Sequence, residues 1–223
     1  MRLKPLVVGI SAYAIFVQPA FSDITRIRNG QMAVNCEGRF SNEITYRSTS
    51  SSPSITNGKL ENIVGLVDVA ANPPDPTIPA TPALGSTVIT GALANPCAVG
   101  GGSVTFTLNG AVQTNVVVPR IFLQGVAQQP ANPIRRDETG AFTYRIVFTP
   151  CGGLAGNAAL SVRASGNIEG ARVRPATVNL AAAPTTVTVT GKIVREGDGF
   201  GLVTVSAVHA GRECAVPTAR IEW

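Results

Sequence analysis

Four cysteines are the residues of this 223-residue chain whose types and spacing most directly suggest a chemistry. They stand at positions Cys36, Cys97, Cys151 and Cys214. An even number of cysteines predicts a disulfide framework if the chain is exported, and four cysteines allow three connectivities. The separations within the first and the second pair are nearly equal, so we expect the bridges Cys36–Cys97 and Cys151–Cys214. A bridge closing a loop of this size stabilises a fold by about 4 kcal/mol in the chain-entropy model.

Metal binding is the alternative chemistry for these cysteines. Zinc sites use closely spaced cysteines and histidines, whereas this chain has no Cys-x-x-Cys and a single histidine, His209. The stretch "GDGFG" at 197–201 has one acid, which is too few for a calcium site. The stretch "AVGGGS" at 98–103 is followed by neither the lysine nor the helix of a phosphate-binding loop. We therefore expect no metal and no cofactor.

Hydrolytic catalysis would need groups that the sequence does not bring together. His209 alternates with Val203 and Ala207 in an apolar run, which predicts a partly buried histidine at the end of a strand. No Gly-x-Ser-x-Gly motif supplies a nucleophilic serine for a triad. The adjacent acids Asp137 and Glu138 would point to opposite faces of a strand, unlike the carboxylate pair of a glycoside hydrolase. We expect no catalytic residue.

The elements that must position these residues are strands, because no segment beyond the N-terminal one keeps a helical period. The run "AFTYRIVFT" at 141–149 alternates apolar and polar residues. Asn109-Gly110 between two alternating runs predicts a hairpin, since both turn positions need a positive φ. The runs on either side of Gly197–Gly199 predict a second hairpin. Strands this short, separated by turn signals, are typical of antiparallel sandwiches.

An internal repeat predicts two sandwiches in tandem. The stretches "CEGRFSNEITYR" at 36–47 and "CGGLAGNAALSVR" at 151–163 both read Cys-x-Gly-x-x-x-Asn before an alternating run. Further matches follow in the same order: Asn62-Ile63 with Asn167-Ile168, Pro79-Ala80-Thr81 with Pro175-Ala176-Thr177, Thr90-Gly91 with Thr190-Gly191, Val104-Thr105-Phe106 with Val203-Thr204-Val205, and Val118-Pro119 with Val216-Pro217. We expect an all-β chain of tandem immunoglobulin-like antiparallel β-sandwiches, with one larger jelly-roll-type sandwich as the alternative.

The repeat sets the expected domain boundaries. Domain 1 is expected over 23–123 and domain 2 over 137–223, joined by a polar, proline-bearing linker over 124–136. The final run "VPTARIEW" predicts the last strand of domain 2, with Ile221 and Trp223 on one face. In size, strand spacing and tandem repetition the pattern resembles the broad class of bacterial exported immunoglobulin-like modules, although no tryptophan stands between two core cysteines.

The N-terminal segment 1–22 has the three parts of a secretory signal peptide. Arg2 and Lys4 are basic, an apolar run covers 6–17, and small residues flank Phe21 before the expected cleavage after Ser22. The apolar run is too short to span a bilayer unaided. We expect export to the periplasm, the cell surface or the medium, with no transmembrane segment after cleavage.

Charge narrows the classes of partner. The chain carries a formal net charge of +5 at pH 7, its basic residues are scattered, and Arg135-Arg136 is the only basic pair, so we expect no nucleic-acid partner. The sequence predicts an exported, non-catalytic β-sandwich protein with a structural, adhesive or binding role at the bacterial envelope or cell surface. Its partner, a protein or a surface glycan, is not identified. The alternatives are a carbohydrate-active or other hydrolytic protein on the same scaffold and a periplasmic two-domain chaperone.

Overall fold

The computed structural model describes residues 24–30, 32–110, 112–128, 133–194 and 199–222. The expected signal peptide over 1–22, the tip of the second expected hairpin and Trp223 lie outside these residues. All regular elements of the described residues are strands, and none of these residues forms a helix long and apolar enough to cross a membrane.

Ten strands form the N-terminal sandwich. They are β1 (Ile24–Asn29), β2 (Ala33–Val34), β3 (Arg39–Ser48), β4 (Ser54–Ile55), β5 (Gly58–Val64), β6 (Leu66–Asn72), β7 (Thr77–Ile78), β8 (Leu84–Leu93), β9 (Gly102–Leu108) and β10 (Val112–Val118). One sheet has the order β1-β3-β8-β6 with β2 added to β3, and the facing sheet has the order β10-β9-β5. The short strands β4 and β7 pair only with each other, and β7 contributes the completely buried Ile78 to the core.

Ten more strands form the C-terminal sandwich. They are β11 (Leu123–Gln128), β12 (Ile134–Arg135), β13 (Ala141–Pro150), β14 (Asn157–Ser165), β15 (Ile168–Arg174), β16 (Thr177–Asn179), β17 (Thr185–Ile193), β18 (Phe200–His209), β19 (Arg212–Ala215) and β20 (Ala219–Glu222). Its sheets have the orders β11-β13-β17-β15 and β12-β20-β18-β14-β16, with β19 added to β18. Every pairing is antiparallel except that of β12 with β20.

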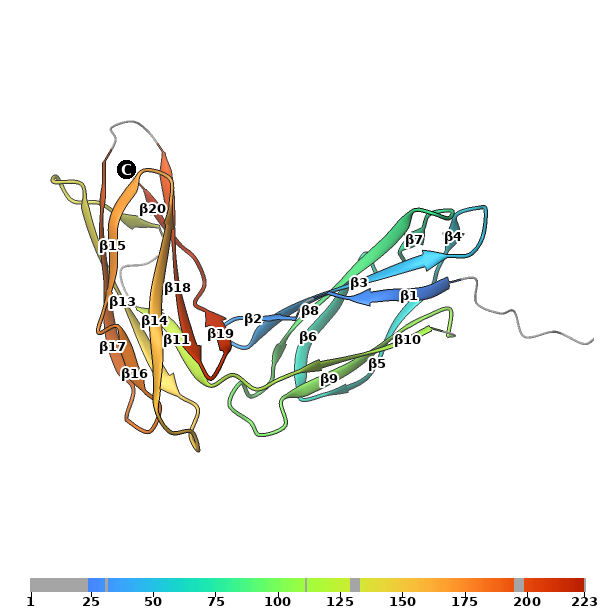
Figure 1. The fold of residues 1–223 in the computed structure, drawn as a ribbon, viewed down its shortest axis with the longest axis horizontal. Helices are drawn as coiled ribbons and strands as arrows, with labels where there is room; N and C mark the ends of the chain where they lie inside the picture. Colours follow the sequence, from blue (N-terminus) through green and yellow to red (C-terminus); the bar gives the residue numbers. More distant parts are fainter. Residues whose placement is uncertain (1–23, 31, 111, 129–132, 195–198, 223) are drawn as a thin grey trace, which may run out of the picture.

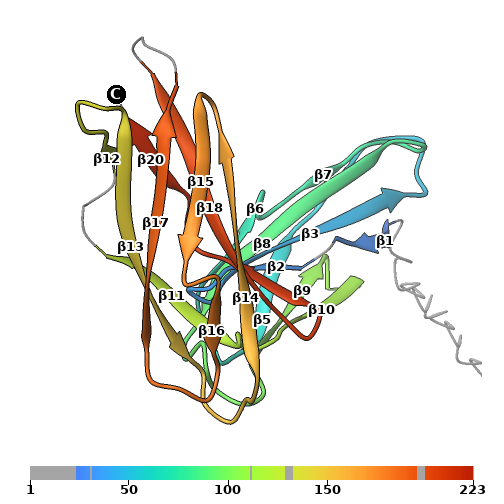
Figure 2. The same ribbon diagram turned by 60° about the vertical axis from the view of Figure 1, so that its left-hand side comes forward.

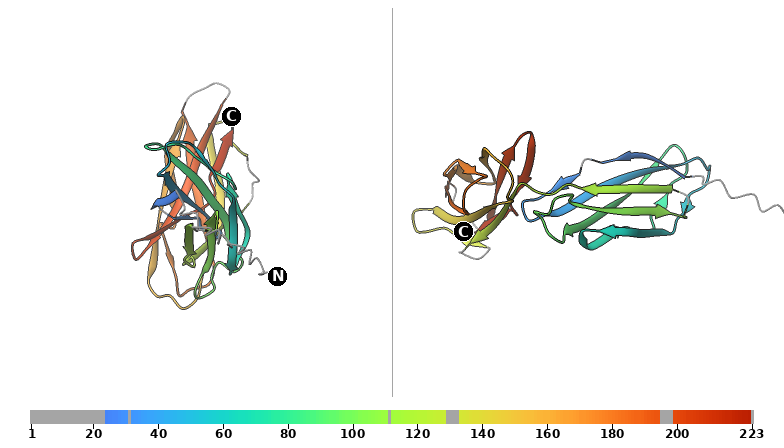
Figure 3. Two further views of the ribbon diagram at one scale, coloured as in Figure 1. Left: turned by 90° about the vertical axis from the view of Figure 1, so that its right-hand side faces the viewer. Right: turned by 90° about the horizontal axis from the view of Figure 1, so that it is seen from below.

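Two separate hydrophobic cores confirm the prediction of tandem immunoglobulin-like sandwiches. Ile44, Ile89 and Phe106 are at most 1% exposed in the N-terminal core, and Phe148 and Val187 are completely buried in the C-terminal core. Figures 1 and 2 show the two sandwiches inclined to each other, and Figure 3 shows that they meet over a short junction. The single jelly-roll-type sandwich is therefore not the fold.

The expected linker over 124–136 is wrong. Most of β11 lies in this range and pairs with β13, while β12 lies in it and pairs with β20. The segment reads as a linker because β11 is an edge strand in which Leu123 is its buried apolar side chain and Gly125, without a side chain, also packs against the core. A Cβ at Gly125 would stand 2.7 Å from Phe148 Cε1 and 2.8 Å from Val216 Cγ2, so no side chain fits there.

The structure confirms one of the two expected hairpins and contradicts the other. β9 and β10 pair in register around Asn109 and Gly110, whose φ angles of 52° and 67° confirm the first hairpin. The second expected hairpin is wrong, because β17 and β18 belong to different sheets of the C-terminal sandwich. Alternation places apolar residues on one face of each strand but does not say which sheet the strand joins.

The internal repeat holds at the matches of Gly91 with Gly191 and of Val104 with Val203. It does not hold at the cysteine motif, nor at Val118-Pro119 and Val216-Pro217, because Val118 ends β10 whereas Val216 precedes β20. Gly91 is opposite Phe40 in the N-terminal sandwich, and Gly191 is opposite Phe142 in the C-terminal one. Val104 and Val203 are both completely buried, each two residues after a glycine that packs against β6 or β15. The two Cys-x-Gly stretches are not equivalent, since one precedes β3 and the other follows β13, its counterpart. Asn62 and Asn167 are not equivalent either, because only Asn62 lies within a strand.

Substitution of Gly191 by alanine should destabilise the protein by about 1–3 kcal/mol, the usual effect of overpacking. The new Cβ would stand 2.4 Å from Cζ of Phe142, a side chain that is only 2% exposed and has no free space to enter. Urea denaturation measures the change. Gly152→Ala is the control, because its Cβ would meet no atom within 4 Å, and a loss of stability as large as that of Gly191→Ala would contradict the packing argument.

Candidate functional site at the stapled junction

Both disulfides cross the junction between the sandwiches. Cys36 is joined to Cys214 and Cys97 to Cys151, each with a Cα–Cα distance of 4.9 Å. The expected pairing within halves, Cys36–Cys97 and Cys151–Cys214, is therefore wrong. Equal separation along the chain does not decide the pairing. All four cysteines lie where the ends of the two sandwiches meet, and there each one bonds to a cysteine of the other half. They precede β3, follow β8, follow β13 and lie in β19, respectively.

Cys36 comes from the N-terminal half of the chain but packs in the C-terminal sandwich. Its N–H donates to the carbonyl of Ala215 at 2.9 Å, and its own carbonyl accepts from the N–H of Gly125 at 3.1 Å. The residue is completely buried and packs within the core of the C-terminal sandwich. It therefore spans the gap between β11 and β19 as an additional element of that sandwich.

The reverse contact also occurs, because Cys151, which follows β13 of the C-terminal sandwich, packs in the N-terminal core. Cys151 is 2% exposed within the N-terminal core, and its N–H donates to the carbonyl of Phe122 at 3.1 Å. The N–H of Ile121 donates to the carbonyl of Pro96 at 3.0 Å, and the Arg212 guanidinium donates to a backbone carbonyl at position 120. The two sandwiches thus share three covalent connections: the chain itself and two disulfides.

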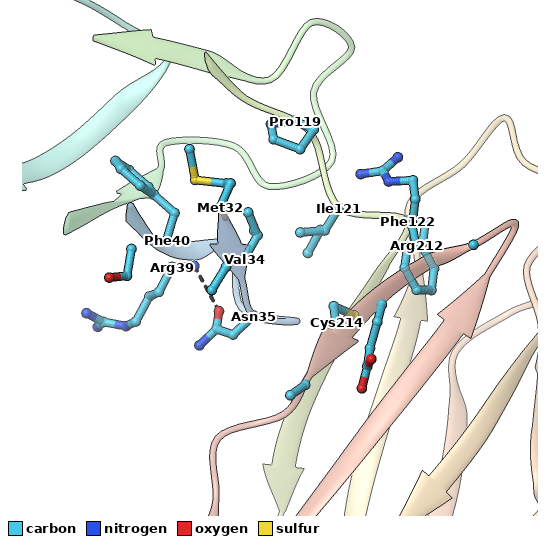
Figure 4. Close-up of a pocket in the computed structure, with 15 residues that line it drawn as sticks. Met32, Val34, Asn35, Arg39, Phe40, Pro119, Ile121, Phe122, Arg212 and Cys214 are labelled. Atoms are coloured by element: carbon cyan, nitrogen blue, oxygen red, sulfur yellow. Dashed lines mark hydrogen bonds between the residues drawn. The ribbon is translucent and has the colours of Figure 1, made fainter. Parts of the chain in front are cut away.

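An open groove of about 740 Å³ lies along this junction. Figure 4 shows Met32, Val34 and Phe40 from the N-terminal sandwich on one side, with Phe122 and Arg212 on the other. The strands β2 and β19 border the groove and contact each other. The site thus has the concave, mainly apolar character of a surface that binds a partner.

The polar groups that line the groove include one acid and a turn-forming asparagine. Glu213 is the single acid among the described residues that line it, whereas glycoside hydrolysis needs a pair of carboxyl groups. Asn35 is held by its own turn, where its Oδ1 accepts from the N–H of Arg39 at 2.8 Å and of Glu37 at 3.0 Å. Across the described residues, no group of three or more His, Cys, Asp or Glu side chains could hold a metal ion.

His209 lies near the groove at the end of β18 and is partly buried, as the sequence predicted. Its ring centroid lies 5.9 Å from that of Phe122, and its Nδ1 lies 3.3 Å from the carbonyl oxygen of Asn157. These contacts fix the ring between a packed aromatic side chain and the start of β14. They give the histidine a packing role at the junction.

The carboxylate of Asp137 shapes a turn before β13. Its Oδ1 accepts from the Thr139 hydroxyl at 2.7 Å and from the N–H groups of Thr139 at 2.8 Å and Ala141 at 2.9 Å. The hydroxyl and backbone hydrogen bonds to the charged form hold the pKa of Asp137 below its ordinary value of 3.8. By contrast, burial raises the pKa of Tyr144 well above its usual range, so this tyrosine keeps its proton within the core.

Substitution of Asp137 by alanine should lower stability at neutral pH and not at strongly acidic pH. A carboxylate whose pKa is lowered by folding stabilises the fold at pH values above its unfolded-state pKa. This stabilisation is lost as pH falls through the folded-state pKa. Urea midpoints of wild type and variant should therefore differ at neutral pH and converge as pH falls through the folded-state pKa of Asp137. Glu138→Ala is the control, and an equal loss of stability in that variant would contradict the role of the turn.

A second exposed feature is the outer side of β18 and β20. Phe200 is 50% exposed and Leu202 is 39% exposed on β18. The guanidinium carbon of Arg220 lies 4.2 Å from the centroid of the Phe200 ring, and Arg220 Nε lies 2.9 Å from Glu222 Oε1. An apolar sheet face with an aromatic and charged groups is a second surface able to contact a partner.

Comparison with known proteins finds similarity of fold. No protein-family model matches the chain. No curated protein matches it. Among solved structures, domains 4 and 5 of the S-layer protein SbsC align over 54% of this chain and 64% of theirs, at 13% identity and a TM-score of 0.27. The tandem Ig repeats of Dlar align over 90% and 97%, at 11% identity and a TM-score of 0.32.

The Yersinia pseudotuberculosis adhesin InvE aligns over 91% of this chain and 59% of its own, at 12% identity and a TM-score of 0.26. This chain thus spans less than two thirds of the S-layer and adhesin structures.

Proposed function

We propose that the protein is an exported, non-catalytic β-sandwich protein with a structural, adhesive or binding role at the bacterial envelope or cell surface. The observation that carries the proposal is that both disulfides join the two sandwiches. Disulfides persist in oxidising compartments, so this architecture supports export behind the signal peptide proposed over 1–22. We place the boundary between the two domains at 121–123, where the chain passes from one core to the other.

The stapled junction supports a structural and binding role over a catalytic one. Three covalent connections fix the groove and the two sandwich surfaces relative to each other, which reduces the ordering that a partner must impose on binding. The groove offers an apolar floor with one described acid, which suits recognition of a protein or surface glycan better than acid–base chemistry. We propose that a partner of one of these two classes contacts the groove.

Surface labelling of intact cells tests the proposal. An antibody raised against the purified protein should bind cells with an intact envelope, or cells whose outer membrane alone has been opened. A cytoplasmic protein probed in parallel should stay unlabelled in both samples. Labelling only after complete lysis, or hydrolysis of a glycan or peptide substrate by the purified protein, would overturn the proposed role.

Glycan arrays and capture of envelope proteins then separate the two classes of partner. Wild type should retain a ligand that the groove variant Met32→Ala, whose side chain is only partly buried, releases. Leu202→Ala is the matched control because it removes an exposed apolar side chain near the start of β18, whereas the groove residues 211–215 follow the other end of that strand. Equal retention by both variants would place the partner elsewhere.

A further inference from the structure

The Cys36–Cys214 bridge provides a covalent shortcut across the molecule. Tension that enters the chain before Cys36 and leaves it after Cys214 passes through this bridge, because the two cysteines are bonded to each other. The intervening chain, which accounts for a sequence separation of 178, lies outside the direct load path. Strands β3 to β18 thus lie within a loop that tension at the two ends does not pull open, whereas β1, β2 and β20 lie in the load path.

The segments that remain in the load path are short and already largely extended. Twelve residue steps lead from Ile24 to Cys36 through β1 and β2, and eight lead from Cys214 to Glu222 through β19 and β20. Figure 1 shows β1 running along the N-terminal sandwich towards the junction, where β2 and β19 meet, and β20 continuing along the C-terminal sandwich. Strands have nearly their full length already, so little length remains to be released.

The load-bearing strands are also held by the sheets beside them. β1 is paired with β3 over most of its length, and β20 is paired with both β18 and β12. Pulling these strands along their own axes therefore acts on several hydrogen bonds together. The second bridge, Cys97–Cys151, joins the same two sandwiches and keeps the junction closed at another point.

We propose from this connectivity that the protein acts as a load-bearing connector that stays nearly inextensible under tension. The function goes beyond the proposed surface role and holds whatever partner the groove binds. A connector of this kind transmits force between neighbours on its two sides through the bridge, without tension on the chain between Cys36 and Cys214. This resistance to extension depends on the Cys36–Cys214 bridge, which the sequence pattern does not predict.

Single-molecule stretching of the oxidised protein, with handles before residue 24 and after residue 222, tests the proposal. The twenty residue steps outside the bridge allow a stretched length of only ~70 Å at the full reach of the chain. With Cys36→Ser and Cys214→Ser, the path runs through Cys97–Cys151 instead and should reach ~500 Å, about seven times as far. Reduction of both bridges should allow ~700 Å.

The matched control is the double variant Cys97→Ser and Cys151→Ser. It removes one bridge across the same junction but leaves the short load path intact, so its stretched length should stay at ~70 Å. Stretched length follows covalent connectivity, so the readout survives even if a variant folds poorly. Extension of oxidised wild type by several hundred ångströms, or equal extension of the two double variants, would overturn the inference. Neither outcome depends on the cell-surface labelling that tests the proposed function.

Discussion

Removing the Cys36–Cys214 bridge by the double substitution Cys36→Ser and Cys214→Ser should lower the free energy of unfolding by about 5 kcal/mol. The bridge closes a loop with a sequence separation of 178, and its loss frees that much unfolded chain. Both residues are buried within the C-terminal core, at 0% and 3% exposure, so serine would also place hydroxyl groups among apolar atoms. Urea denaturation of variant and oxidised wild type measures the change.

The second bridge provides the comparison for the first. Cys97→Ser with Cys151→Ser opens a loop with a sequence separation of 54, for which the chain-entropy model predicts about 4 kcal/mol. Each variant should lose the stability of one bridge while keeping the other. Peptide mapping without reduction must recover Cys36 linked to Cys214, and a peptide linking Cys36 to Cys97 would contradict both the connectivity and the stability argument.

The sequence predicts the strands well because alternation is a local property. In β13, Phe142, Tyr144, Ile146 and Phe148 are all at most 3% exposed, as their period of two requires. The match of Thr90-Gly91 with Thr190-Gly191 also reflects a physical constraint. Each glycine leaves room for a phenylalanine ring on the neighbouring strand, so composition alone did not produce it.

The disulfide pairing is not predictable from such local patterns. It depends on which strand ends meet at the junction, and that is set by how two complete sandwiches dock. The repeated Cys-x-Gly motif pointed to equivalent cysteines, yet Cys36 precedes its strand and Cys151 follows the counterpart of that strand. Cys36 and Cys151 are each buried in the core of the opposite sandwich, a relation that exists only after both cores have formed.

The candidate groove also escapes sequence reasoning. Its walls come from segments far apart in the chain, around Met32, Ile121 and Arg212, and its residues have ordinary types. One signal was available in the sequence: Cys97 stands before the matched residue Val104, whereas Cys214 stands after its counterpart Val203, so the two cysteines do not occupy equivalent positions in the repeat. A pairing between the halves explains that mismatch, because it does not require the two domains to place their cysteines alike.

Deletion of residues 219–223 should destabilise the C-terminal sandwich by about 3–5 kcal/mol, as expected for loss of a large buried side chain. The deletion removes Ile221, which is completely buried, and Ala219, which is 7% exposed. It also uncovers the edge of β18 and takes from β12 the strand with which it pairs. Amide hydrogen exchange should therefore speed up in β12 and β18.

The N-terminal sandwich should keep its protection in the same experiment, because β3 and β8 pack in a separate core and both bridges remain intact. Arg220→Ala with Glu222→Ala is the control on the same strand. These side chains form an exposed ion pair at 2.9 Å, and such pairs contribute about 0–1 kcal/mol. If the deletion speeds exchange equally in β3 and β8, the two stapled sandwiches unfold as one unit. Unchanged protection of β18 would instead show that the C-terminal run does not complete its sheet.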